Sequence, residues 1–140
     1  MAVKQLSILA RNRKGSLRKI IDIIAASGAD LRSICIADTE DFGILRVISD
    51  KPDVAVEALL DAGYTARVRK VVAIAVEDRP GALAEALDIL DDAGINLEYM
   101  YSVINGEKDK AYMVLRVDDN ARTEAIFREA GIQVLQEEDI

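Results

Sequence analysis

The segment Glu77-Asp78-Arg79-Pro80-Gly81-Ala82-Leu83 decides the fold, because its pattern occurs twice in the chain. The earlier copy is Asn12-Arg13-Lys14-Gly15-Ser16-Leu17, 66 residues before Asp78–Leu83. A second pair of segments keeps this offset, since Ser27-Gly28-Ala29-Asp30-Leu31 returns as Ala93-Gly94-Ile95-Asn96-Leu97. The period exceeds the roughly 20–50 residues of stacked solenoid repeats. We therefore predict two similar small domains, residues 1–69 and 70–140.

Each half contains the same predicted order of elements, βαββαβ. A strand runs into the repeated loop, and apolar residues at helical spacing follow the loop glycine up to Gly28 or Gly94. A hairpin, a second helix ending at Gly63 or Gly131 and a short strand complete each half, with Asn105-Gly106 as the clearest turn signal. The predicted strands are 3–10, 31–37, 42–49 and 64–68, then 71–76, 97–104, 110–117 and 132–136; the second helices are 53–62, opened by Asp50, and 120–130.

Right-handed crossovers place both helices of each half on one face of an antiparallel sheet, which is the ferredoxin-like α+β arrangement. In its strand order, 4-1-3-2, the second strand lies at an edge and needs a partner. We therefore predict that strands 31–37 and 97–104 pair side by side. The result would be an eight-stranded antiparallel sheet with four helices on one face, and its open face favours a homodimer.

Composition excludes several classes of function. The chain has no histidine, which removes the usual general base and the commonest metal ligand, and Cys35 is its single cysteine. We expect no enzyme activity, no catalytic residues, no metal and no cofactor. A net charge of −7 argues against nucleic-acid binding. No apolar run reaches the roughly 20 residues of a membrane span and no signal peptide is visible, so we expect a cytoplasmic protein.

The charge is unevenly divided. Residues 1–69 carry a net charge of +2 and residues 70–140 a net charge of −9. Basic residues gather around the first loop, where they form a solvated face, a collar that attracts anions or a docking surface for the acidic half. They are Arg11, Arg13, Lys14, Arg18 and Lys19.

The loop Asp78-Arg79-Pro80-Gly81-Ala82-Leu83, followed by Gly94-Ile95-Asn96-Leu97, closely resembles the ACT domain, a small-molecule-binding module of amino-acid metabolism. The resemblance covers the whole chain as a tandem pair. It implies that a free amino acid binds between two domains paired side by side, touching the loop of one and the start of the second strand of the other. The implied ligand-binding residues are Asn12, Arg13, Lys14, Gly15, Ser16, Leu17, Asp30 and Leu31, and Asp78, Arg79, Pro80, Gly81, Ala82, Leu83, Asn96 and Leu97.

Physical chemistry supports this scheme, although each residue also has a plainer interpretation. A glycine lets the backbone approach a ligand, and the N–H groups that open a helix suit a carboxylate. The same glycines could be ordinary turn residues, Asn12 or Asp78 an N-cap, and Asp30 or Asn96 an Asx turn. Tyr99 and Tyr101 are interpreted as packing residues.

The first copy departs from the family pattern, with Asn12 in place of the loop aspartate, Lys14 in place of the proline and Asp30 in place of the asparagine. Cross-domain pairing would therefore set Asn12 opposite Asn96, and Asp78 opposite Asp30. We expect the amide pair to form the better site, because amides can serve both ends of an amino acid whereas two carboxylates repel each other.

These observations lead to one functional hypothesis and one alternative. The first is a stand-alone regulatory protein that binds a small amino acid between its ACT domains and signals to a partner enzyme of amino-acid metabolism. The alternative is a structural or oligomerisation subunit whose ligand sites are vestigial.

Overall fold

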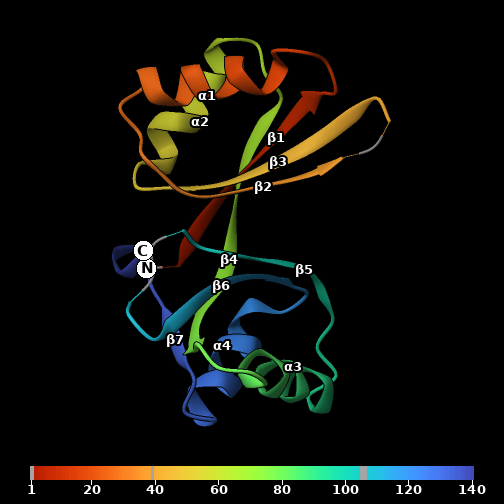
Figure 1. Ribbon diagram of the computed structural model, residues 1–140, viewed down its shortest axis with the longest axis vertical. Helices are drawn as coiled ribbons and strands as arrows, with labels where there is room; N and C mark the ends of the chain where they lie inside the picture. The colour runs from red at the N-terminus through yellow and green to blue at the C-terminus, as the bar shows by residue number, and fades with distance from the viewer. Residues whose placement is uncertain (1, 39, 105–106) are drawn as a thin grey trace. The chain divides into compact units, whose positions relative to one another are not determined.

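The computed structural model describes residues 2–38, 40–104 and 107–140 (Figure 1). It divides into two compact units. The amino-terminal unit is Lys4–Lys70, and the carboxyl-terminal unit joins Val71–Ile140 with the amino-terminal residues up to Val3. The predicted turn at Asn105-Gly106 lies outside the described residues, as does Thr39 in the other hairpin connection.

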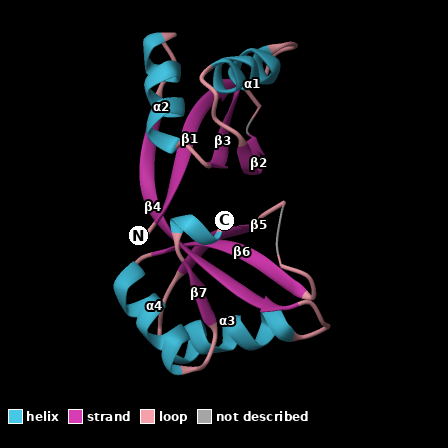
Figure 2. Ribbon diagram, turned by 90° about the vertical axis from the view of Figure 1, so that its left-hand side faces the viewer, coloured by secondary structure: helices cyan, strands magenta, loops and turns pink. Residues whose placement is uncertain are grey.

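The amino-terminal unit contains a sheet of four strands. Their order is β2-β3-β1-β4, which confirms the predicted 4-1-3-2 order. Two helices cover one face of this sheet and share a core with it, in which Leu6, Ile20, Leu45 and Leu59 are fully buried (Figure 2). The elements are β1 (Val3–Arg11), α1 (Ser16–Ala26), β2 (Leu31–Asp38), β3 (Phe42–Ser49), α2 (Pro52–Asp61) and β4 (Ala66–Glu77).

The carboxyl-terminal unit repeats this arrangement with β7, the later part of β4, β6 and β5 as its strands. Alternate residues of β4, Val72 and Ile74, point into a core with Leu90 and Phe127, all of them at most 1% exposed. The elements that follow β4 are α3 (Ala82–Asp92), β5 (Leu97–Ser102), β6 (Lys110–Val117), α4 (Asn120–Glu129), β7 (Gln133–Leu135) and the 3-10 turn η1 (Glu137–Asp139).

One strand serves both units. We predicted separate strands at 64–68 and 71–76, but β4 runs unbroken from Ala66 to Glu77. Val68-Arg69-Lys70-Val71 contains no glycine or proline, so nothing in the local sequence ends the extended conformation. The predicted number of eight strands is therefore wrong. The sheet has seven strands in the described residues, because the two halves share β4.

The two strands that we predicted to pair side by side, β2 and β5, are the outer strands of their units. Their pairing with each other stays a prediction. β2 pairs with β3, and β5 pairs with β6, each through an antiparallel ladder.

The helix ends follow the sequence signals, with one correction. Gly28, Gly63, Gly94 and Gly131 all have positive φ one residue beyond a C-cap, as predicted. The residue that caps the start of α2 is Lys51, not Asp50, and Pro52 occupies the first turn. None of the helices in the described part of the chain is long and apolar enough to cross a membrane.

Candidate functional site

The two repeated loops have the same backbone geometry. In the first, the N–H of Arg13 donates to the carbonyl of Arg11 at 2.9 Å and the N–H of Ser16 donates to Arg13 at 3.1 Å. In the second, the N–H of Arg79 donates to Glu77 at 3.0 Å and the N–H of Ala82 donates to Arg79 at 3.3 Å. The repeat in the sequence is therefore a repeat in structure.

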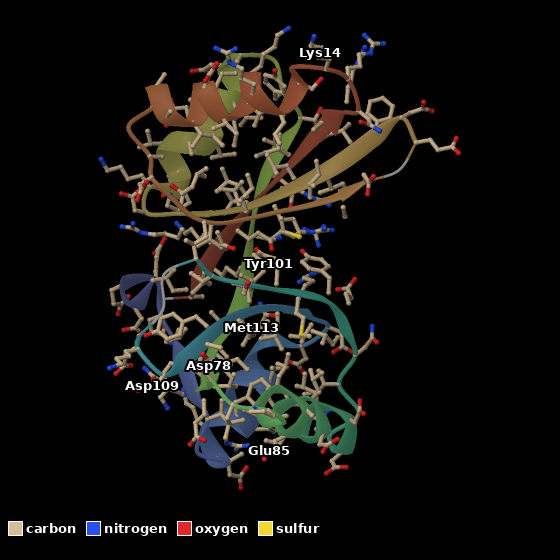
Figure 3. All side chains as sticks on the ribbon, in the orientation of Figure 1. Lys14, Asp78, Glu85, Tyr101, Asp109 and Met113 are labelled. Atoms are coloured by element: carbon tan, nitrogen blue, oxygen red, sulfur yellow. The ribbon has the colours of Figure 1, made fainter. Side chains whose placement is uncertain are left out.

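Each loop is also held by the connection between the second and third strands of its own unit. The N–H of Asn12 donates to the carbonyl of Asp41 at 3.0 Å, and the N–H of Asp78 donates to that of Asp109 at 2.9 Å. Figure 3 shows Asp78 and Asp109 close together, with Lys14 on the first loop. Asp109 has a φ of 64°, a conformation that non-glycine residues adopt uncommonly.

The loop glycines open the helices in a left-handed conformation. Gly15 has a φ of 84° and Gly81 a φ of 88°, and each is the N-cap of the helix that follows. Neither helix receives a side-chain hydrogen bond at this end. The interpretation of Asn12 and Asp78 as N-caps is therefore wrong. Backbone N–H groups at the start of α1 and α3 remain as donors for an anion.

The loop and the start of the second strand lie apart within each unit. The 11 residues of α1 separate Gly15 from Asp30, and the 11 residues of α3 separate Gly81 from Asn96. At about 1.5 Å per residue, an α-helix of that length spans roughly 16 Å. One unit alone therefore does not bring these two predicted parts of a site together.

Asp30 is already engaged by its own unit. One of its carboxylate oxygens pairs with Nη1 of Arg32 at 2.6 Å, and its backbone N–H donates to the Asp50 carboxylate at 2.7 Å. The hydrogen bond from the Asp30 N–H is the largest cause that lowers the pKa of Asp50, and the positive charges of Lys51 and Arg32 lower it further. Asn96 is exposed, and its side chain makes no hydrogen bond within the described ranges.

The remaining predicted residues differ in accessibility. Leu17 and Pro80 are exposed, Leu31, Leu83 and Leu97 are half-buried, and Ala82 is buried. Tyr99 and Tyr101 stack on each other with ring centroids 6.4 Å apart, which confirms that they are packing residues.

A cavity lies beside each loop, and the two cavities are lined by corresponding positions of the two repeats. The first has a volume of about 470 Å³, and the polar part of its lining includes Arg11, Arg13, Lys14, Ser16 and Lys19. The second has a volume of about 170 Å³ and includes Glu77, Arg79 and Glu85. Arg11, Arg13 and Lys19 occupy the positions of Glu77, Arg79 and Glu85 at the offset of 66.

The second cavity contains its own ion-pair network. Arg79 donates through Nε to Glu77 at 2.6 Å and through both terminal nitrogens to Glu85 at 3.1 and 2.7 Å. The contact with Glu85 is the largest cause that raises the pKa of Arg79, and it lowers the pKa of Glu85. Arg79 is one of the predicted site residues, but this network was not predicted. Its signal in the sequence is the exchange of basic for acidic residues at the offset of 66.

The chain matches the model of one family, described as an ACT domain pair, over residues 1–140. Comparison with curated proteins gave no match. Among solved structures, protein BT0572 from Bacteroides thetaiotaomicron is 35% identical with a TM-score of 0.92, over 99% of this chain and 95% of that one.

The regulatory subunit of aspartate kinase from Thermus thermophilus, in its ligand-free form, is 15% identical with a TM-score of 0.69, over 94% of this chain and 92% of that one. The corresponding subunit from Thermus flavus is 16% identical with a TM-score of 0.67, over the same shares. The repeated loops, the doubled βαββαβ order and the full-length match agree, and the chain belongs to the ACT domain pair family.

Proposed function

We propose that this chain is a non-enzymatic regulatory protein that binds a small amino acid through its ACT loops and signals to a partner enzyme. The observation that carries the proposal is the pair of loops in which a left-handed glycine opens a helix without a side-chain cap. An ACT domain pair is a regulatory module, and two structures that share its fold are regulatory subunits.

The loop supplies groups for the carboxylate end of an amino acid. The N–H groups that follow Ser16 in α1 or Ala82 in α3, together with the positive end of the helix dipole, favour a negative charge at this place. Gly15 and Gly81 have no side chain, and a Cβ built on either would meet nothing within 4 Å. The space above each loop is therefore open to a ligand.

The ammonium end needs an acceptor, which we propose comes from the start of the second strand of another ACT domain. Asn96 offers an amide oxygen that no described residue uses. The carboxylate of Asp30 is held by Arg32. At the second strand, this difference supports the site of Asn12 and Asn96 as the better of the two. The side-chain nitrogen of Asn12 donates to the carbonyl of Glu40 at 3.3 Å, so its amide oxygen is the atom offered to a ligand.

The test is calorimetric titration of the chain with each of the twenty common amino acids. We expect one or a few to bind. Asn96→Ala should weaken that binding by about fivefold to 150-fold, since an unpaired polar group costs about 1–3 kcal/mol. Asp30→Ala is the matched control and should change the affinity much less.

Two results would contradict this proposal. No heat with any amino acid would favour the alternative, a structural subunit with vestigial sites. Loss of binding in Asp30→Ala with full binding in Asn96→Ala would show that the other site is the functional one.

We also propose that the protein is a homodimer in the cytoplasm. Ile34 and Ile36 are 40% and 49% exposed on β2, which is an outer strand of the sheet. Edge strands with exposed apolar side chains favour pairing with another chain. Light scattering on the purified chain would give the mass directly, and a monomer at micromolar concentration would exclude this assembly.

A further inference from the structure

We propose that the cavity beside the first loop binds a small organic anion that carries at least two negative charges. This cavity, called here the basic cavity, is lined by Arg11, Arg13, Lys14 and Lys19 together with Ser16 and Tyr64 and smaller apolar contributions. All of its lining residues belong to the amino-terminal unit. The basic cavity shares Arg13, Lys14 and Ser16 with the loop of the proposed amino-acid site, but it needs no residue of a second domain.

The strongest support is the comparison of the two halves. In the second half the guanidinium of Arg79 forms ion pairs with two carboxylates, those of Glu77 and Glu85. In the first half Arg13 occupies the same place in an equivalent loop, but Arg11 and Lys19 stand where the two carboxylates would be. The first half therefore has the arginine and lacks the two anionic groups that neutralise it in the second.

The four cationic side chains have no internal partner. Within residues 2–38, 40–104 and 107–140, the side chains of Arg11, Arg13, Lys14 and Lys19 make neither a hydrogen bond nor an ion pair. Four positive charges gathered around one cavity repel each other, and an anion bound among them relieves that repulsion. Ser16 adds a hydroxyl donor, and the uncapped start of α1 lies on the same loop.

Two acidic residues beside this cluster, Glu40 and Asp41, form no ion pair with it in the described part of the chain. Both line an adjacent cavity with Arg11 and Arg13. Asp41 instead contributes its backbone carbonyl, which accepts from Asn12. The basic cavity itself has no acidic residue in its lining.

Size and shape indicate an organic ligand. The basic cavity has a volume of about 470 Å³, which is within the range of about 300–1,000 Å³ typical of small-molecule sites. Its equivalent in the second half has only about 170 Å³. Phe42 and Tyr64 supply aromatic surface at its wall, which suits a ligand with a carbon framework. Phosphorylated and polycarboxylate metabolites share this chemistry.

The test is calorimetric titration of the full chain with pyrophosphate and with citrate, without any amino acid present. We expect saturable binding of one anion per chain, weakened by added NaCl. Tighter binding of pyrophosphate would identify the ligand as a phosphoryl compound, and tighter binding of citrate would identify it as a polycarboxylate.

Matched variants separate a site from a general effect of charge. Lys19→Gln should weaken binding by about tenfold, because one charge-assisted contact is lost. Arg18→Gln removes the same charge from the next position of the same helix, where the side chain is 86% exposed and pairs with Asp22. It should change the affinity less than twofold. The double variant Arg11→Glu with Lys19→Glu recreates the second-half network around Arg13 and should abolish binding.

The proposal is overturned if neither anion binds at millimolar concentration, or if Arg18→Gln weakens binding as much as Lys19→Gln. It is also overturned if the double variant remains folded, by circular dichroism, and still binds with the parent affinity. None of these results bears on the titration with amino acids, so the two proposals fail separately.

Discussion

Replacing Gly81 by alanine tests the left-handed loop that opens α3. The φ of Gly81 is 88°, and a left-handed conformation costs a residue with a Cβ about 1–2 kcal/mol. An added Cβ meets no atom within 4 Å, so no clash adds to this cost. Alanine also lowers the conformational entropy of the unfolded chain, which stabilises the folded state by about 0.4–1 kcal/mol. We expect a net loss of about 1 kcal/mol.

Urea unfolding followed by circular dichroism measures this loss. For a slope of about 2 kcal/mol per molar urea, the midpoint should fall by about 0.5 M while the slope stays unchanged. Gly81→Asn is the control, since asparagine adopts the left-handed conformation more readily and should lose less. If Gly81→Ala is as stable as the parent or more stable, φ at this position is negative and the loop geometry argued above is incorrect.

Two further predictions concern the core and the ion-pair network. Phe127 is fully buried, so Phe127→Ala should lower the free energy of unfolding by about 3–5 kcal/mol in thermal denaturation, whereas a loss below about 1 kcal/mol would mean that the side chain is not in the core. Because Arg79 lowers the pKa of Glu85 from its ordinary value of 4.5, this pair stabilises the folded chain above that pH and loses its effect as the pH falls through the lowered pKa. Urea unfolding between about pH 5 and pH 3 should therefore show a smaller acid-induced loss of stability in Glu85→Gln than in the parent, and equal losses would argue against the pair.

The sequence predicted the elements well where local chemistry decides the structure. The apolar stripe that contains Ile20 and Ile24 required a buried helix face, and Gly28 and Gly94 marked the ends of helices. The repeated loop could be located for the same reason, because a glycine with positive φ leaves a visible signal.

The errors arose where the outcome depends on distant parts of the chain. We predicted that one strand ends at Val68 and the next begins at Val71, but the charged residues between them, Arg69 and Lys70, are compatible with a continuous strand once its neighbours supply hydrogen bonds. Asn12 and Asp78 were plausible N-caps by type, yet the turn before each helix assigns that position to the glycine. The network around Arg79 depends on Glu85, which lies in the first turn of α3 and contacts the loop only once the helix has formed.

The shared strand β4 limits how this protein can be dissected. The repeat in the sequence invites a cut between Arg69 and Lys70 to obtain two separate domains for study. The peptide bond between Arg69 and Lys70 lies inside β4, Ala66–Glu77. The cut would therefore divide a continuous strand, and each fragment would keep only part of it. A fragment of the first half should therefore extend through residue 77, and a fragment of the second half should begin at residue 66, so that each keeps the whole of β4.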